Sequence, residues 1–213
     1  MQQIKISGKV PDMVGLRERK KQRTRRALIE AALRLFDEKG FEETTLAEIA
    51  AEADVATRTF FSYFASKEDV LFFDGESRMV LAMELISSRM PGERLADLLL
   101  RLVRSSMDWA TDSDGFSVEE VPLRMRLIMS VPSLQARALH LLFDSQLRLA
   151  RALEDAFPDE LDHVDAAAAV GALIGATKLA VISSINRGGS LEQAEEAAVR
   201  AADLTLRGLS SIG

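Results

Sequence analysis

The feature that most constrains this chain is the stretch 44–67, which reads as two short helices with almost nothing between them. Thr44 or Thr45 can cap the first helix, and Glu48, three residues after Thr45, completes a capping box. Apolar residues of this helix recur at three- and four-residue steps, which gives it one buried face. Asp54 breaks the pattern, so it marks a turn before the second helix.

The second helix is expected from about Thr57 to Phe64, with one apolar and one polar face. Three aromatic residues are expected to pack inward: Phe60, Phe61 and Phe64. The outward residues are of the types that reach base edges and phosphates in a major groove: Thr57, Arg58, Thr59, Ser62 and Tyr63. A short helix, a tight turn and a polar-faced helix predict a helix-turn-helix. An ordinary helical hairpin is the alternative that this stretch alone leaves open.

The charge of the chain is unevenly distributed. The formal net charge is −6, yet residues 1–67 hold thirteen basic and ten acidic side chains, which leaves them at +3 and the remainder at −9. A positive N-terminal third on an acidic body is expected when only one end meets phosphate. The segment 17–26 contains seven basic residues opposed only by Glu18. It is either a solvated helix start or an arm that contacts phosphates or a minor groove.

The composition argues against several other classes of protein. Apolar residues make up 47% of 213 residues, enough for a large core, and there is no cysteine, which suits a reducing, cytoplasmic location. There are two histidines and no Gly-x-Ser-x-Gly, phosphate-loop or His-Glu-x-x-His motif, so we predict no catalytic residue, no metal site and no cofactor. No apolar run follows a basic patch near the N-terminus, so no secretory signal is predicted.

Every segment keeps a helical period, so we predict an all-α chain of about nine helices. The expected helices are 22–39, the two helices within 44–67, 67–89, 93–110, 118–129, 132–157, 162–186 and 191–209. Gly40 should end the first of these, and Ser190 should cap the last. The predicted organisation is a flexible tail over 1–16, a three-helix helix-turn-helix domain over 17–66, and a helical ligand-binding and dimerisation domain over 67–213.

The N-terminal third resembles a known family. The resemblance rests on the run Arg25–Phe36, then Gly40-Phe41, Thr44-Thr45, Ile49-Ala50, Ala53–Val55, Thr59–Phe61, Tyr63-Phe64 and Lys67-Glu68. Together, these motifs resemble the N-terminal domain of TetR-family transcriptional regulators. The resemblance implies base contacts from Arg58, Thr59 and Ser62, with Thr57 at the margin, and phosphate contacts from Thr45, Tyr63 and Lys67. Arg25, in the basic segment, is a further predicted phosphate contact.

Two positions depart from the family pattern. Asp54 stands where the family usually has Gly, and Asp tolerates a left-handed conformation less well than Gly. Ala56-Thr57 stands where the family often has Ser-Pro. Ala56 cannot cap a helix, so Thr57 is expected to cap instead, with a shift of the helix start.

The last two helices are expected to form a dimer. Their small residues, such as Gly171 and Gly175, allow close approach, and the interface is expected to include Leu204. The family resemblance also implies a four-helix interface between two subunits; packing within one subunit is the alternative. The segment Ala166–Ile185 comes nearest to a membrane span, but Lys178 lies at its middle, so no membrane association is predicted.

The effector pocket is expected in the helices between residues 67 and 157. Its candidate residues are Trp109, Met125, Met129, His140, Phe143 and Lys178. For each of them, an ordinary structural role, such as a core aromatic residue or a gap-filling Met, is the stronger alternative. The resulting hypothesis is a homodimeric, sequence-specific DNA-binding regulator, a repressor that a small lipophilic ligand releases from a palindromic operator in double-stranded DNA. A regulator without a small-molecule effector, controlled by a protein partner or constitutive, is the alternative, and an enzyme is much less supported.

Overall fold

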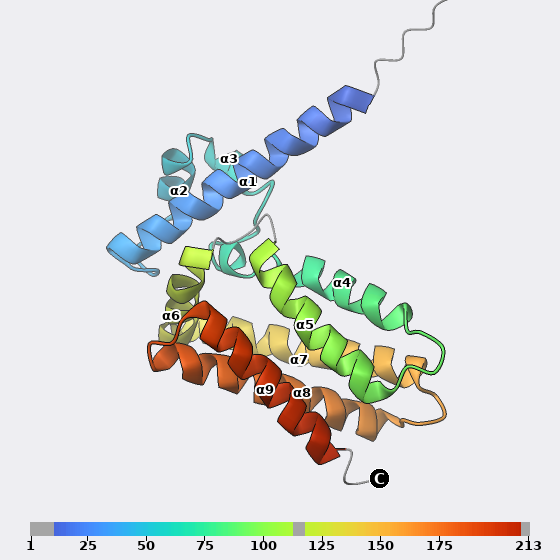
Figure 1. Cartoon of the computed structure of the whole chain (residues 1–213). Helices are drawn as coiled ribbons and strands as arrows, with labels where there is room; N and C mark the ends of the chain where they lie inside the picture. The colour runs from blue at the N-terminus through green and yellow to red at the C-terminus, as the bar shows by residue number, and fades with distance from the viewer. Residues whose placement is uncertain (1–10, 113–117, 210–213) are drawn as a thin grey trace, which may run out of the picture. The chain divides into compact units, whose positions relative to one another are not determined.

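The computed structural model describes residues 11–112 and 118–209, without the side chains of residues 11–14, 108–112, 118 and 209. Every secondary-structure element in these ranges is helical, with nine α-helices and two short 3-10 helices (Figure 1). The predicted all-α class is therefore confirmed. The chain divides into two compact units, the first ending at Leu71 and the second beginning at Phe72.

The first unit contains α1 (Pro11–Lys39), α2 (Leu46–Glu52), α3 (Thr57–Phe60) and the 3-10 helix η1 (Glu68–Leu71). Of the predicted tail over 1–16, residues 1–10 lie outside the described residues, and residues 11–16 already belong to α1. The basic segment 17–26 therefore lies on a helix that starts before the predicted Gln22. Its residues from Arg17 to Arg23 are exposed.

The core of the first unit joins α1 to the helix-turn-helix. The residues with no exposed surface come from all four helices: Leu28, Ile29, Ala32, Ile49, Phe60, Val70 and Leu71. Each large apolar side chain buried in this way contributes about 1.5–3 kcal/mol relative to exposure. Gly40, with φ of 94°, ends α1 in the left-handed region, and the Phe41 ring centroid lies 4.9 Å from that of Phe36. The predicted C-cap is confirmed.

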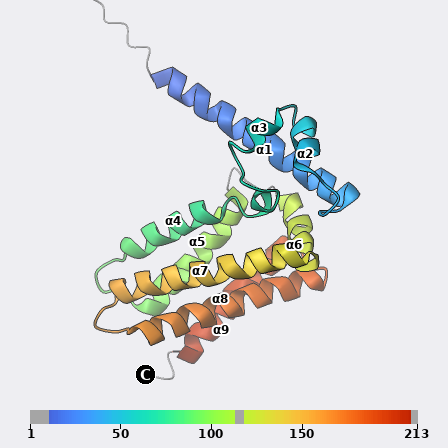
Figure 2. The same cartoon turned by 180° about the vertical axis from the view of Figure 1, so that it is seen from behind.

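The second unit is a helical bundle, seen from two sides in Figures 1 and 2. Its elements are α4 (Gly75–Ser87), α5 (Leu95–Asp112), the 3-10 helix η2 (Val118–Glu120), α6 (Val121–Ser130), α7 (Pro132–Ala156), α8 (His163–Asn186) and α9 (Leu191–Leu209). Both views show α8 between α7 and α9, and α8 packs against both. By length and composition alone, α8 is also the one described helix that could cross a membrane.

Side-chain and backbone capping sets the ends of these helices. Asp162 accepts hydrogen bonds from the backbone N–H groups of Val164 and Asp165 at the start of α8. The backbone N–H of Gln193 donates to Ser190 Oγ at 3.2 Å, which confirms the predicted cap of α9. The predicted helix over 67–89 is wrong as one segment, because η1 ends at Leu71 and α4 begins only at Gly75.

Candidate nucleic-acid interface and helical body

The capping box at the start of α2 is present. The Glu48 backbone N–H donates to Thr45 Oγ1 at 3.3 Å, and the Thr45 backbone N–H donates to Glu48 Oε2 at 2.9 Å. Hydrogen bonds from Lys39 and then from Thr45 hold the pKa of Glu48 at about 2, below its ordinary 4.5. Thr44 instead donates its hydroxyl to the Gly40 carbonyl at 2.7 Å, which ties the loop to the end of α1. Thr45 is thus the N-cap of α2, and the hydrogen bond from Thr44 ties the loop before it to α1.

The turn between α2 and α3 is a Schellman motif. Asp54 has a φ of 54°, and the backbone N–H of Val55 donates to the Ala50 carbonyl at 2.9 Å. The N–H of Asp54 donates to the Ala51 carbonyl at 3.1 Å, which completes the motif. The left-handed residue in the turn is therefore Asp54, at the position where the sequence departs from the usual Gly.

The start of α3 differs from the prediction. Ala56 occupies the N-cap position with extended backbone and makes no side-chain capping bond, so the prediction that Thr57 caps the helix is wrong. Thr57 is instead the first helical residue. The helix ends at Phe60, although the N–H of Phe64 still donates to the Phe60 carbonyl at 3.0 Å. Beyond Phe60, a hydrogen-bonded turn therefore extends to Phe64, where the predicted helix ends.

The outer face of α3 includes an aromatic residue that the sequence interpretation assigned to the core. Thr57, Arg58 and Ser62 are exposed and Thr59 is half-buried. Phe61 is 56% exposed, so its predicted inward position is wrong. Residues three and four apart on a helix share a face, and Phe61 follows Arg58 by three and Thr57 by four. That spacing would have identified Phe61 as an outward residue.

The predicted phosphate-contacting residues lie in different environments. Thr45 is exposed, and Tyr63 is half-buried. Arg25 is also half-buried, and its side chain already interacts with another group of the protein. The Lys67 ammonium donates to the carbonyls of Phe41 and two further loop residues, Glu42 and Thr44, at 2.7, 3.2 and 3.3 Å. Its side chain is only 18% exposed. A phosphate contact from Lys67 stays a prediction, and it would compete with these three acceptors.

The predicted ligand-binding residues are spread over the second unit. Met125 is half-buried, whereas Met129 on α6 is 48% exposed. His140 and Phe143 lie at exposed positions of α7, with Phe143 at 57%. Trp109 belongs to α5, but its side chain lies outside the described residues. Lys178 is on α8, and it lies close enough to Arg124 and Arg78 to be affected by their charges.

A buried ion-pair cluster was missing from the sequence interpretation. Asp74, at the N-cap position of α4, is 4% exposed and pairs with Arg78 and with Arg124 of α6. Arg124 lies 50 residues away in the sequence, so no local spacing signals the contact. Among the described residues, no group of three His, Asp or Glu side chains lies close enough to hold a metal ion.

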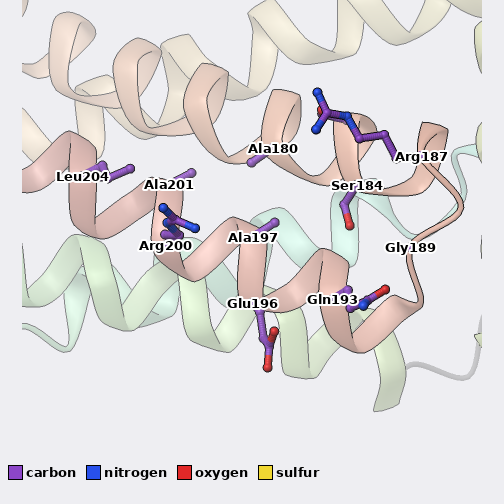
Figure 3. A pocket seen from close by; sticks show the side chains of 11 residues that line it. Ala180, Ser184, Arg187, Gly189, Gln193, Glu196, Ala197, Arg200, Ala201 and Leu204 are labelled. Carbon is purple, nitrogen blue, oxygen red and sulfur yellow. The ribbon is translucent and has the colours of Figure 1, made fainter.

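An open groove runs between α8 and α9 (Figure 3). Ala180 of α8 lines it on one side, and Ala197, Ala201 and Leu204 of α9 line it on the other. Leu204 is 59% exposed. At Gly171 and Gly175, an added Cβ would meet no atom within 4 Å. The predicted dimer residues therefore have space around them within one subunit, and the dimer itself stays a prediction.

Comparison with known protein families agrees with this geometry. Residues 28–72 match the family model described as bacterial regulatory proteins, tetR family. The chain is 34% identical to the HTH-type transcriptional regulator TcmR of Streptomyces glaucescens over 143 residues, which cover 66% of this chain and 63% of TcmR. It is 46% identical to the regulator HbdR of Aromatoleum sp. over 48 residues, 22% of this chain and 21% of HbdR. The chain thus matches less than two thirds of either relative's length.

Solved structures share the fold. The fatty acid degradation regulator FadR from Bacillus halodurans has a TM-score of 0.59 at 20% identity, covering 95% of this chain and 98% of FadR. A complex of SmeT with triclosan has a TM-score of 0.58 at 22% identity, covering 87% and 90% of the two chains. The organism of SmeT is Stenotrophomonas maltophilia. The sequence match over residues 28–72 assigns the helix-turn-helix to the TetR family of bacterial regulatory proteins, and the described chain shares its all-helical fold with these solved regulators.

Proposed function

We propose that this protein is a homodimeric, sequence-specific regulator of transcription that binds a palindromic operator. The observation that carries the proposal is the outer face of α3, where Thr57, Arg58, Phe61 and Ser62 are exposed on a helix-turn-helix. Arg58 has no hydrogen bond or ion pair with any described residue, so its guanidinium is available for a base or phosphate. Arginine donates two hydrogen bonds to guanine in the major groove, the commonest specific contact.

The flanking charges support binding to the DNA backbone. Arg17, Arg19, Lys20, Lys21 and Arg23 are exposed on α1. Neutralising phosphates with such groups releases counterions and makes affinity strongly dependent on salt. The exposed Thr45 at the start of α2 adds a hydroxyl and a helix N-terminus, both of which are common phosphate contacts.

The groove between α8 and α9 supports the dimer. Leu179 on α8 is 68% exposed, and Leu204, which lines the groove together with Ala180, Ala197 and Ala201, is 59% exposed. Small residues allow two helix pairs to approach closely and bury these leucines. One helix-turn-helix reads few base pairs, so a two-fold dimer on an inverted repeat, with half-sites about 34–36 Å apart, is the fitting solution.

The proposed control is release by a small ligand that binds the second unit. In the sequence, α4 follows the helix-turn-helix through η1. A ligand that prefers a shifted α4 would change the separation of the two recognition helices, so ligand and DNA would oppose each other through one equilibrium. SmeT, which shares the fold, forms a complex with triclosan. Release of this kind makes the protein a repressor wherever its operator overlaps a promoter.

The test begins with DNA selection from random sequence and from the promoter regions beside the gene. Wild-type protein should enrich an inverted repeat. Arg58→Ala should lose about 1–3 kcal/mol of specific binding and relax the preference at one position in each half-site. Arg23→Ala is the matched control, because it removes the same charge from an exposed site on α1 and should weaken all sequences alike.

A second experiment tests ligand control. The operator complex is titrated with a library of lipophilic compounds, and release is followed by fluorescence anisotropy. Release by a compound that also raises the thermal midpoint of the free protein is the expected result. If the inverted repeat is enriched but no compound releases it, the protein is a DNA-binding regulator without a small-molecule effector. Absence of any enriched sequence would overturn the DNA-binding proposal.

A further inference from the structure

The second unit holds two arginines against one buried carboxylate. Arg124 donates from Nη2 to Asp74 Oδ1 at 3.0 Å and from Nη1 to Oδ2 at 3.3 Å. Arg78 Nη2 lies 2.6 Å from the same Oδ2. The Arg78 Nε–H is buried and has no hydrogen-bond partner among the described residues. A buried donor without a partner costs free energy, so an acceptor for this N–H would stabilise the cluster.

Lys178 brings a third cation to the same region from α8. It is the only lysine in residues 68–213. No carboxylate of the described residues forms an ion pair or hydrogen bond with it. Water reaches its side chain, yet the surrounding protein lowers the pKa of its ammonium group, and the charges of Arg124 and then Arg78 lower it further. The Lys178 side chain is therefore accessible to a ligand and close to the two arginines.

The helices around Lys178 are less tightly packed here than elsewhere in the unit. The fully buried residues of α8 end at Leu173, and its remaining residues to Asn186 are half-buried or exposed. On α7, no residue between Leu134 and Leu149 is fully buried. Apolar side chains such as Met125, Ile174 and Val181 are only half-buried. Three cations therefore occur beside apolar surface that the chain itself does not cover.

A purely structural role explains this arrangement poorly. A buried ion pair contributes little net stability, because desolvation offsets the attraction. Asp74 and Arg124 already pair with each other, so a third positive charge from Lys178 adds repulsion without a bond. Ionisable groups perturbed by burial and by like charges are typical of functional sites.

We propose that Lys178, together with Arg78 and Arg124, binds the acid group of a small organic acid whose apolar body lies against the half-buried side chains of α6 and α8. The carboxylate would neutralise Lys178 and accept a hydrogen bond from Arg78. This inference rests on the proposed ligand control and names the chemical class of the ligand: an amphipathic acid rather than a neutral lipophile.

The experiment compares matched acids and amides on the full-length protein by calorimetry. Decanoate is paired with decanamide, and 1-naphthoate with 1-naphthamide, so that each pair differs only in the charged group. Wild-type protein should bind an acid more tightly than its amide. Lys178→Met, which keeps the length of the side chain, should weaken acid binding about tenfold to a hundredfold and leave amide binding unchanged. Arg104→Gln, an exposed cation on α5, is the control and should bind like wild type.

A second readout needs no ligand. Lys178→Met should raise the thermal midpoint of the free protein, because it removes a cation that has no partner. A lower midpoint would count against an open anion site. The proposal is overturned if no acid binds more tightly than its amide, or if Lys178→Met keeps the preference. A third outcome separates the two proposals. If Lys178→Met abolishes acid binding, but the acid does not release the wild-type protein from DNA, the site is supported and ligand-controlled release is contradicted.

Discussion

The Lys67 ammonium donates a hydrogen bond to the Phe41 carbonyl at 2.7 Å and lies 4.4 Å from the centroid of the Phe41 ring. Two residues 26 positions apart in the sequence are therefore joined at the loop between α1 and α2. That loop carries Thr45, the cap of α2. Lys67 thus holds the start of the helix-turn-helix in place.

Lys67→Met should lower the free energy of unfolding of the first unit by about 1–3 kcal/mol, because three hydrogen bonds from a charged donor and one cation–π contact are lost. Denaturant unfolding measures this change. If Lys67 also contacts a phosphate, as the sequence predicts, the dependence of DNA affinity on salt should become shallower by about one unit in the variant. An unchanged slope would leave Lys67 with the structural role alone.

Asp54 offers a test of the turn. Its φ of 54° is costly for any residue with a side chain, and Gly adopts it freely. Asp54→Gly should therefore stabilise the protein by about 0.5–1 kcal/mol, whereas Asp54→Ala should destabilise it. Chemical denaturation of the two variants beside wild type gives the comparison. Equal effects of Gly and Ala would mean that the Asp side chain, not the backbone, determines the stability of the turn.

The sequence predicts features that depend on neighbouring residues, and it misses contacts between residues far apart in the chain. The capping box of Thr45 and Glu48, the left-handed Gly40 and the cap at Ser190 all depend on neighbouring residues, so local spacing was enough. The break before α4 involves Asp74, whose carboxylate pairs with Arg124. No local pattern encodes a partner 50 residues away.

Phe61 was misplaced for a different reason. Hydrophobicity alone predicts that Phe60, Phe61 and Phe64 are all core residues, although only Phe60 and Phe64 are buried, at 0% and 3% exposure. Hydrophobicity favours burial but does not require it, and the helical register decides which face a residue occupies. Phe61 is therefore an exposed aromatic side chain on the surface that we propose contacts DNA.

Glu48 should titrate far below its ordinary range. Because its pKa is lowered from 4.5 to about 2, it stabilises the folded first unit fully above pH 4.5, and that contribution is lost as the pH falls from 4.5 towards 2. The carboxyl carbon shift of Glu48 should show a midpoint near 2. Glu48→Gln should flatten the dependence of unfolding on pH in this window. A midpoint near 4.5 would show that the bonds from Lys39 and Thr45 do not persist in solution.

Phe61 is expected to contact the methyl group of a thymine. It shares the exposed face of α3 with Arg58, and an apolar side chain distinguishes thymine through its methyl group. Replacing that thymine by uracil in the selected operator should cost the wild type about 1 kcal/mol, the value of one buried methyl group. Phe61→Ala should bind the thymine and uracil operators equally. Ser62→Ala serves as the control, because it should keep the wild-type difference.

Leu204 tests the dimer. Its side chain is 59% exposed beside the groove of α8 and α9, and the proposed partner subunit would remove that apolar surface from water. Leu204→Arg would place a charge there and should shift the protein to monomers in analytical ultracentrifugation, with loss of binding to the inverted repeat. The same substitution at Leu139, which is 53% exposed on α7, should leave a dimer. A dimeric Leu204→Arg variant that still binds the repeat would place the interface elsewhere, because a new charge cannot be buried in a close-packed helical interface without a large penalty.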